Sequence, residues 1–253
     1  MPAQVTPSTE AQLIEVFSSI QGEGLLVGCR QIFLRFARCN LDCAYCDTPF
    51  APQPECRIED APGSGNFSSL PNPVGLELLY NVLFQWQKGA AGMHHSIALT
   101  GGEPLLHSDV LEEWLPALRR LLPIHLETNG TLPEALPALL TYLDWIAMDI
   151  KLESVTGQPT FWEAHKAFLA QLRGGRDQIK LVVGEETPLE EVSRAASLVH
   201  ELAPETPLVL QPVTRHGQMT LGPRQLLDLQ ATVASRHPAV RVIPQTHRFI
   251  GLL

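Results

Sequence analysis

Short apolar runs alternate with longer amphipathic stretches along most of the chain. Predicted strands are the apolar runs 31–37, 96–100, 123–128, 144–150, 179–183 and 207–212, with a further short run at 239–243. The amphipathic stretches between them predict helices near 74–88, 108–121, 133–142, 160–172, 188–202 and 222–236. Strands that alternate with helices of this length favour right-handed βαβ crossovers and a parallel sheet. We therefore expect one α/β domain over residues 1–253.

The stretch 49–73 departs from this alternation. It holds prolines at positions 49, 52, 54, 62, 71 and 73 and glycines at 63 and 65. Such punctuation predicts a long loop or a small insertion. This segment either covers a reactive site or is an incidental excursion.

Polar side chains gather where three predicted strands end. Residues two apart on a strand face the same way. The sets that share a face are Arg35 with Ala37 and Cys39, His125 with Glu127 and Asn129, and Asp149 with Lys151. Sites in α/β barrels are built at the carboxyl ends of strands, which these positions fit. The alternative is that they are ordinary polar entries into loops.

Charge and composition narrow the class of partner. The chain has 253 residues, of which 45% are hydrophobic and 18% charged, with a formal net charge of −9. A field of that sign repels nucleic acid and favours a small-molecule partner. We find neither a signal-like start nor an apolar run long enough to span a membrane, so we expect a cytoplasmic protein without membrane contact.

Three of the five cysteines fall close together, at Cys39, Cys43 and Cys46. Thiolates ligate iron–sulfur clusters, and three of them leave one iron of a 4Fe-4S cluster open for another ligand. Structural zinc is the alternative, and it would need a fourth ligand from Cys29, Cys56 or a histidine. The x3-x2 spacing favours the cluster.

The stretch CNLDCAYCD (39–47) resembles the cluster loop of radical S-adenosylmethionine (SAM) enzymes, and TGGEP (100–104) resembles their glycine-rich cofactor motif. The resemblance implies a partial (β/α)6 barrel of the TIM type, with a loop insertion after the cysteines. It also implies SAM bound beside the cluster, with Glu103 suited to an ammonium group. Residues that the resemblance assigns to the cofactor are Tyr45, Gly101, Gly102, Glu103, Asn129 and Lys151.

A narrower resemblance covers the chain from about residue 14 to its end. The segment FSSIQGEG (17–24) is similar to the opening motif of 7-carboxy-7-deazaguanine synthases, and CDT (46–48), ETNG (127–130), DIK (149–151) and QTHR (245–248) agree with it. That family converts 6-carboxy-5,6,7,8-tetrahydropterin to 7-carboxy-7-deazaguanine with loss of ammonia, in queuosine and 7-deazapurine biosynthesis. Residues it implies for the substrate are Ile20, Gln21, Glu23, Arg35, Thr100, Glu127 and His247, with Thr48 for magnesium.

Several of these assignments have a second interpretation. Arg35 would otherwise form a salt bridge with Glu127 or Asp149, Thr48 would be a turn residue, and His247 a surface residue. The chain also departs from the family in carrying Arg38 where a glycine is expected, and LESVTG at 152–157. Cys29 is expected in or near the core, and Cys56 as an exposed loop thiol.

The resemblance further implies an electron donor such as flavodoxin or ferredoxin, and a homodimer. A glycyl-radical-enzyme activase shares the cysteine spacing, but it acts on a protein and has no use for a pterin-binding loop. A non-catalytic zinc or iron–sulfur module would leave the TGGEP and ETNG segments as coincidence.

Overall fold

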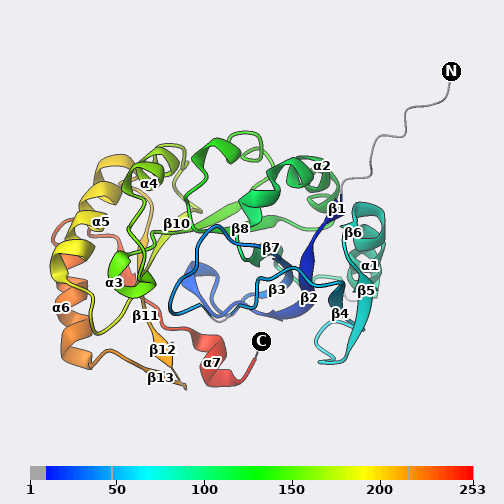
Figure 1. Ribbon diagram of the computed structural model, residues 1–253, viewed down its shortest axis with the longest axis horizontal. Helices are drawn as coiled ribbons and strands as arrows, with labels where there is room; N and C mark the ends of the chain where they lie inside the picture. Colours follow the sequence, from blue (N-terminus) through cyan, green and yellow to red (C-terminus); the bar gives the residue numbers. More distant parts are fainter. Residues whose placement is uncertain (1–9, 47, 90, 216, 253) are drawn as a thin grey trace.

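A curved sheet of ten strands forms the centre of the computed structural model, which describes residues 10–46, 48–89, 91–215 and 217–252 (Figure 1). Its strand order is β14-β11-β10-β9-β8-β7-β3-β2-β4-β5. The strands that run parallel are β3 (Arg30–Phe36), β7 (Ser96–Gly101), β8 (Ile124–Thr128), β9 (Trp145–Asp149), β10 (Gln178–Val183), β11 (Leu208–Pro212) and β14 (Val240–Val242). These match the predicted strands, and within the described ranges β14 and β5 remain two separate edges. The sheet is thus a partial barrel, as expected.

The amino-terminal side of the sheet is built differently from the rest. Strand β2 (Leu13–Ile20) runs antiparallel to β3 and was not predicted. The insertion at 49–73 is largely a hairpin of β4 (Glu55–Glu59) and β5 (Phe67–Pro71) that extends the sheet beyond β2. Two small ladders pair β1 (Glu10–Ala11) with β6 (Val74–Gly75), and β12 (Thr214–Arg215) with β13 (Gln218–Met219).

The hairpin overturns the prediction for Cys56. This thiol lies on β4 and is fully buried, so the expectation of an exposed loop thiol is wrong. Burial raises its pKa to about 12. Cys29 is half-buried, consistent with a place near the core.

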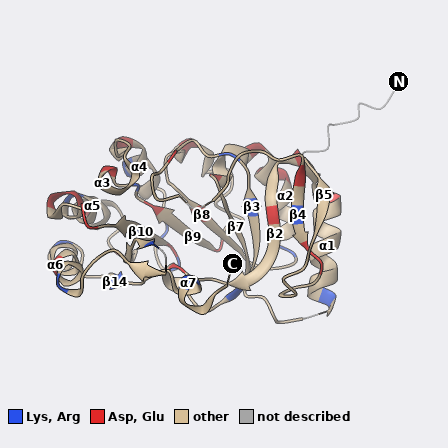
Figure 2. Ribbon diagram, turned by 60° about the horizontal axis from the view of Figure 1, so that its bottom comes forward, with Lys and Arg blue, Asp and Glu red and all other residues tan. Residues whose placement is uncertain are grey.

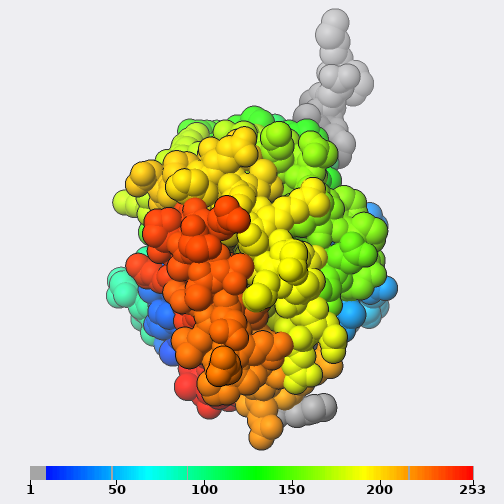
Figure 3. Space-filling view, turned by 90° about the vertical axis from the view of Figure 1, so that its left-hand side faces the viewer, coloured from blue at the N-terminus to red at the C-terminus, as the bar shows by residue number. Residues whose placement is uncertain are grey.

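Five helices lie on the outer side of the sheet (Figure 1). They are α1 (Leu76–Gly89), α2 (Ser108–Leu118), α4 (Trp162–Leu169), α5 (Leu189–Leu202) and α6 (Pro223–Ala234). Figure 3 shows α5 in yellow and α6 in orange side by side in the middle of one face. Short elements are η1 (Gly24–Leu26), η2 (Pro104–His107), η3 (Pro133–Ala135), α3 (Glu153–Thr156) and α7 (Thr246–Ile250).

One predicted helix is wrong. The stretch 133–142 contains only η3, and turns follow it. Pro137 stands in the middle of this stretch, where a proline removes a helical hydrogen bond and clashes with the preceding turn.

The two faces of the parallel sheet differ in chemistry. Outward-facing residues such as Ile97, Leu126 and Met148 are fully buried in the main apolar core beneath the helices. Burial of such aliphatic side chains is the main stabilising contribution, since truncating one to alanine typically costs about 2–5 kcal/mol. The inward face instead carries polar residues, such as Glu127 and Lys180, between a few apolar ones. Alternation along the strands thus separates the core from a polar interior.

Acidic and basic side chains lie on neighbouring strands at one side of the sheet. Figure 2 shows basic and acidic positions on the neighbouring strands β3, β2 and β4, where Glu15 lies between Arg35 and Arg57. In the part of the chain that the structure describes, we find no helix long and apolar enough to cross a bilayer.

Candidate active site

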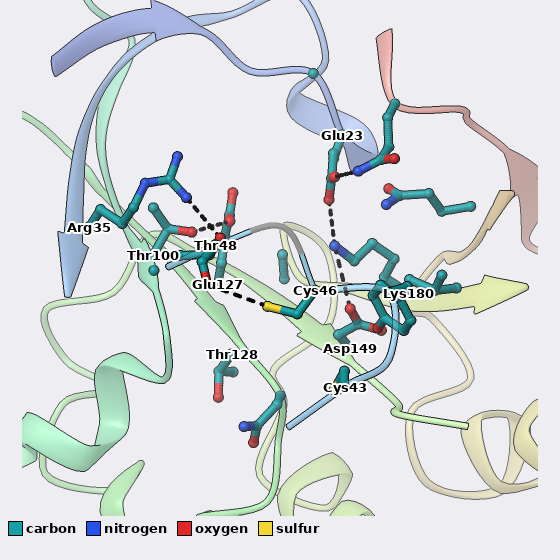
Figure 4. Close-up of a pocket in the computed structure, with 18 of the residues that line it drawn as sticks. Glu23, Arg35, Cys43, Cys46, Thr48, Thr100, Glu127, Thr128, Asp149 and Lys180 are labelled. Carbon is teal, nitrogen blue, oxygen red and sulfur yellow. Dashed lines mark hydrogen bonds and ion pairs between the residues drawn. The ribbon is translucent and has the colours of Figure 1, made fainter. Parts of the chain in front are cut away.

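A pocket opens at the carboxyl ends of the parallel strands. Its wall is formed by the cysteine loop after β3, the loop 21–24 after β2, and the segment 245–248 (Figure 4). All predicted site residues except Glu103 line it: Ile20, Gln21, Glu23, Arg35, Cys39, Cys43, Tyr45, Cys46, Thr48, Thr100, Gly101, Gly102, Glu127, Asn129, Lys151 and His247. Of the sets predicted to share a face, Arg35 with Cys39, Glu127 with Asn129 and Asp149 with Lys151 reach this pocket. Ala37 and His125 do not line it.

The three clustered cysteines face one cavity. Cys39 Sγ accepts from the Leu41 N–H at 3.5 Å and lies 4.0 Å from Asn129 Nδ2, while Cys46 is exposed. Burial raises the pKa of Cys39, and that of Cys43 to about 11. These thiols therefore need a positive partner before they ionise.

A cluster suits this arrangement better than a single ion. Among the described residues, no three His, Cys, Asp or Glu side chains converge on one metal-ion position. In a cuboidal cluster each cysteine binds a different iron, so the sulfurs stay further apart than around one zinc ion. Cys29 and Cys56 do not line the pocket, which leaves the zinc alternative without a fourth thiolate.

The two glycines of TGGEP fix the cysteine loop. Gly101 has a φ of +116°, and a Cβ there would overlap backbone atoms of Phe36. A Cβ on Gly102 would overlap the carbonyl of Arg38, directly before the first cysteine. Hydrogen bonds from Gly102 N to Phe36 O (3.0 Å) and from Glu103 N to Arg38 O (2.9 Å) hold the two segments together. The absence of side chains thus allows close packing, and both glycines also face the pocket.

Glu103 does not line the pocket, unlike Gly101 and Gly102. Its carboxylate is fully buried and accepts hydrogen bonds from Leu105 N (3.0 Å), Thr128 Oγ1 (2.8 Å) and Asn129 N (2.7 Å). Burial raises its pKa. The structure gives this side chain the task of tying the end of β7 to the end of β8, and its expected contact with an ammonium group stays a prediction.

Loop 21–24 meets the sheet through Glu127. Gln21 Nε2 donates to Glu127 Oε1 at 2.7 Å, and Thr100 Oγ1 donates to Glu127 Oε2 at 2.7 Å. Each carboxylate oxygen keeps acceptor capacity toward the pocket. Glu127 can therefore accept from a bound ligand while its position stays fixed.

Alternating charges cross the pocket floor. Lys180 Nζ lies 2.5 Å from Glu23 Oε2 and 3.5 Å from Asp149 Oδ2, and Lys151 Nζ lies 2.7 Å from that same Asp149 oxygen. Lys151 also donates to the Tyr45 hydroxyl at 2.9 Å. The network joins loop 21–24 to the cysteine loop.

Ion pairing outweighs burial in this network. Burial alone would raise the pKa of Glu23, but Lys180 lowers it to about 2. Burial would lower the pKa of Lys151, yet Asp149 and Tyr45 raise it. Glu23, Lys151 and Lys180 therefore stay charged near neutral pH.

Arg35 forms its ion pair with Glu15, at 2.9 Å, and not with Glu127 or Asp149. It also donates to Thr48 Oγ1 at 3.2 Å (Figure 4). A guanidinium at this distance makes the Thr48 hydroxyl a weak magnesium ligand by itself, because the like charges would repel. Asp47, next to Thr48 in the CDT motif, lies outside the described residues.

The carboxyl-terminal segment closes over loop 21–24. Thr246 N donates to Gly22 O at 2.8 Å, and Gln245 Nε2 donates to Glu23 Oε1 at 2.8 Å. A Cβ on Gly22 would overlap the His247 ring. His247 is therefore half-buried and belongs to the pocket wall.

Three buried oxygen atoms in the pocket lack a hydrogen-bond partner among the described residues: Asp149 Oδ1, Gln211 Oε1 and Thr214 Oγ1. Buried polar atoms in folded proteins are nearly always satisfied. SAM carries hydroxyl and ammonium donors, so this part of the wall fits such a cofactor.

Sequence reasoning missed several pocket residues, among them Lys180, Gln178 and Gln211. Lys180 and Gln211 interrupt the apolar runs 179–183 and 207–212. A polar residue inside a buried strand was the signal that could have found them.

This geometry and a match to the family model of the radical SAM superfamily over residues 34–156 define the class: the protein is a radical SAM enzyme. It is 49% identical over 246 residues to the 7-carboxy-7-deazaguanine synthase of Geobacter sulfurreducens, covering 96% of this chain and 98% of that one. It is 35% identical over 262 residues to the enzyme of the same name from Methanothermobacter thermautotrophicus, covering 96% and 98%. The chain belongs to the 7-carboxy-7-deazaguanine synthase family.

Solved structures agree on the fold. The crystal structure of QueE from Escherichia coli superposes with a TM-score of 0.58 at 21% identity, covering 94% of this chain and 95% of that one. SuiB from Streptococcus suis bound to S-adenosylmethionine superposes with a TM-score of 0.54 at 15% identity, covering 86% and 52%. Family membership sets aside the glycyl-radical activase and the non-catalytic module.

Proposed function

We propose that this protein converts 6-carboxy-5,6,7,8-tetrahydropterin to 7-carboxy-7-deazaguanine with loss of ammonia, a step of queuosine and 7-deazapurine biosynthesis. The observation that carries the proposal is the 49% identity to a 7-carboxy-7-deazaguanine synthase along nearly the whole of both chains. The pocket supports it, because the residues of the family resemblance converge there from distant parts of the sequence.

The chain's own residues divide the pocket into two sides. Cys39, Cys43 and Cys46 would hold the cluster, with SAM against Gly101, Gly102 and the unpartnered oxygens of Asp149, Gln211 and Thr214. When bound, the reduced cluster and SAM would supply the radical chemistry, and these residues would position SAM toward the substrate.

The substrate side lies between Arg35 and Glu23. Arg35 would bind the carboxylate of the pterin, since it keeps N–H groups beyond those given to Glu15 and Thr48. Glu127 would accept from N–H groups of the ring. Segment 245–248 would exclude water above the substrate, which protects a radical from side reactions.

We propose in addition that Thr48 binds a magnesium ion beside the substrate. Magnesium keeps several waters and takes substrate oxygens readily. A substrate carboxylate beside Arg35 would offset the guanidinium charge and complete such a site. Product formation after chelation, with and without added magnesium, tests this part alone.

We also propose a flavodoxin-like or ferredoxin-like electron donor, a homodimer and a cytoplasmic location. Exposure of Cys46 supports the electron donor, because a cluster close to the protein surface can receive electrons from a docked protein. Exposed apolar side chains at Phe249, Ile250 and Leu252 support the homodimer. Sedimentation velocity of the reconstituted protein distinguishes dimer from monomer.

The test of the proposed reaction is anaerobic turnover. Protein reconstituted with iron and sulfide is given dithionite, SAM and 6-carboxy-5,6,7,8-tetrahydropterin, and products are followed by mass spectrometry. We expect 7-carboxy-7-deazaguanine from wild type and none from Cys43→Ala. Cys29 does not line the pocket, so Cys29→Ala is the matched control for Cys43→Ala and should retain product formation. Cleaved SAM with an unchanged pterin would refute the reaction while leaving the class intact.

A further inference from the structure

A chain of buried polar side chains runs from the pocket into the interior of the sheet. Gln21 Nε2 donates to Gln31 Oε1 at 2.9 Å, and Gln31 Nε2 donates to Ser96 Oγ at 2.6 Å. Gln31 Nε2 also lies 3.3 Å from His125 Nδ1. Gln21, Gln31, Ser96 and His125 are all nearly or completely buried. Such a network costs free energy unless every member is satisfied.

Two partners at the pocket end of this chain fix the orientation of the Gln21 amide. Glu127 can only accept a hydrogen bond, and the backbone N–H of Glu23 can only donate one. Gln21 therefore points its amino group at Glu127 Oε1 (2.7 Å) and its carbonyl oxygen at Glu23 N (3.0 Å). The reverse orientation would oppose two acceptors on one side and two donors on the other.

Gln31 is fixed in the same way. Gln21 uses its second N–H on Gln31, so Gln31 must accept there with its oxygen and donate with its nitrogen. Its two N–H groups then go to Ser96 and to His125. His125 Nδ1 must accept, which requires a neutral ring with its proton on Nε2. Burial lowers the pKa of His125 and is consistent with that form.

We propose that Gln31 and His125 are positioning residues for the substrate, which hold Gln21 and through it Glu127 in the single arrangement that accepts N–H groups from the pterin ring. Neither residue lines the pocket, so both act through Gln21. This role rests on the proposed function. It goes beyond that function because Gln31 and His125, which the pterin does not touch, would determine which edge of the ring can form hydrogen bonds.

The same chain also restrains loop 21–24. Gln21 Oε1 accepts from the backbone of Glu23, whose side chain is paired with Lys180. If Gln21 turned over, the loop would lose this hydrogen bond and Glu127 would face a carbonyl oxygen. Positioning by Gln31 therefore affects ligand affinity more than overall folding.

The test is binding of 6-carboxypterin, an oxidised ring, to the reconstituted enzyme with SAM present and no reductant. Quenching of the pterin fluorescence gives the dissociation constant. Gln31→Met keeps the volume and removes the hydrogen bonds. We expect it to weaken binding about tenfold, the equivalent of one net hydrogen bond. His125→Leu should act similarly, whereas His125→Asn keeps an acceptor near the Nδ1 position and should stay within about threefold of wild type.

His237→Leu is the matched control. His237 is also a fully buried histidine with one hydrogen bond, to Thr206 O at 2.9 Å, far from the pocket lining. It should lower the melting temperature about as much as His125→Leu but leave the dissociation constant unchanged. In turnover, Gln31→Met and His125→Leu should release more deoxyadenosine per molecule of product, which a purely structural defect would not do.

Equal affinity for 6-carboxypterin in wild type, Gln31→Met and His125→Leu would overturn this inference and leave the proposed function standing. Failure of wild type itself to bind the pterin would overturn both. If Gln31→Met does not fold, the comparison of His125→Asn with His125→Leu decides, because equal loss in those two variants contradicts an acceptor role for Nδ1.

Discussion

Lys180→Met removes the central charge of the network on the pocket floor. The lysine pairs with Glu23 at 2.5 Å and with Asp149 at 3.5 Å, and its side chain is only 16% exposed. Asp149 keeps Lys151 as a partner after the substitution. Glu23 loses its ammonium partner and stays in a half-buried position, with its side chain 21% exposed, so the cost falls mainly on Glu23.

The magnitude follows from the pKa of Glu23. Its fall from 4.5 to about 2 corresponds to about 3 kcal/mol favouring the ionised form in the folded state. An exposed ion pair would contribute less than about 1 kcal/mol. We therefore expect Lys180→Met to lower the free energy of unfolding at pH 7 by about 2–3 kcal/mol.

The sign of the pH dependence is fixed by the direction of the shift. A carboxyl whose folded pKa is lowered stabilises the protein above its ordinary pKa, and this contribution is lost as the pH falls toward 2. In Lys180→Met, burial would instead raise the pKa of Glu23. The stability gap between wild type and variant should therefore be largest above pH 4.5 and should narrow as the pH falls toward 2.

Urea unfolding of the reduced, metal-free protein measures the effect. A double-mutant cycle with Glu23→Gln should give a coupling of about 2–3 kcal/mol, since the double variant leaves no unpaired charge. Lys166→Met, at an exposed position on α4, is the control and should change stability by less than about 0.5 kcal/mol. A coupling below about 0.5 kcal/mol, or a gap independent of pH, would refute the reasoning.

Three further substitutions or reactions test separate features. Arg38 has a φ of +68°, so Arg38→Gly should stabilise the metal-free protein by about 1 kcal/mol in urea unfolding, whereas Arg38→Ala keeps the strain and should show no gain. Gly102→Ala places a methyl group on the Arg38 carbonyl, so it should lower the free energy of unfolding by about 2 kcal/mol or more and lower the iron content per chain. Gly89→Ala, where the added methyl group meets open space, should change neither. Normal iron content in Gly102→Ala would contradict the close packing of Gly102 on the cysteine loop. Iodoacetamide should label Cys46 in the native metal-free protein but should reach Cys56 only on unfolding, and peptide mass spectrometry measures both. Rapid labelling of Cys56 in the native protein would mean that the β4–β5 hairpin opens.

Apolar periodicity predicted the parallel strands because each has one face in the main core. It failed for β2, where Glu15, Ser18 and Ser19 interrupt the apolar pattern. These residues are nevertheless buried: Glu15 pairs with Arg35 and Arg57, and Ser18 contacts His94 at 2.8 Å. Partners distant in sequence make this strand possible, and a local pattern does not contain them.

The same limit applies to the site. Nearly all residues singled out by motif resemblance line the pocket. Glu103 is the exception: its carboxylate binds Thr128 and the backbone of Leu105 and Asn129, and its ligand role stays a prediction. Motif resemblance left Lys180 out because a lone lysine in a strand carries no motif. The expected glycine at position 38 was informative: the backbone there is left-handed, a conformation that glycine adopts without strain.

In the proposed function the pocket holds SAM and a reduced pterin side by side. Transfer of a hydrogen atom from the pterin to the deoxyadenosyl group of SAM requires this arrangement. With 6-carboxytetrahydropterin deuterated at its non-exchangeable carbon positions, reconstituted enzyme and dithionite, we expect deuterium in the 5′-deoxyadenosine and concurrent 7-carboxy-7-deazaguanine. Unlabelled deoxyadenosine, formed at the same rate with and without the pterin, would contradict this arrangement.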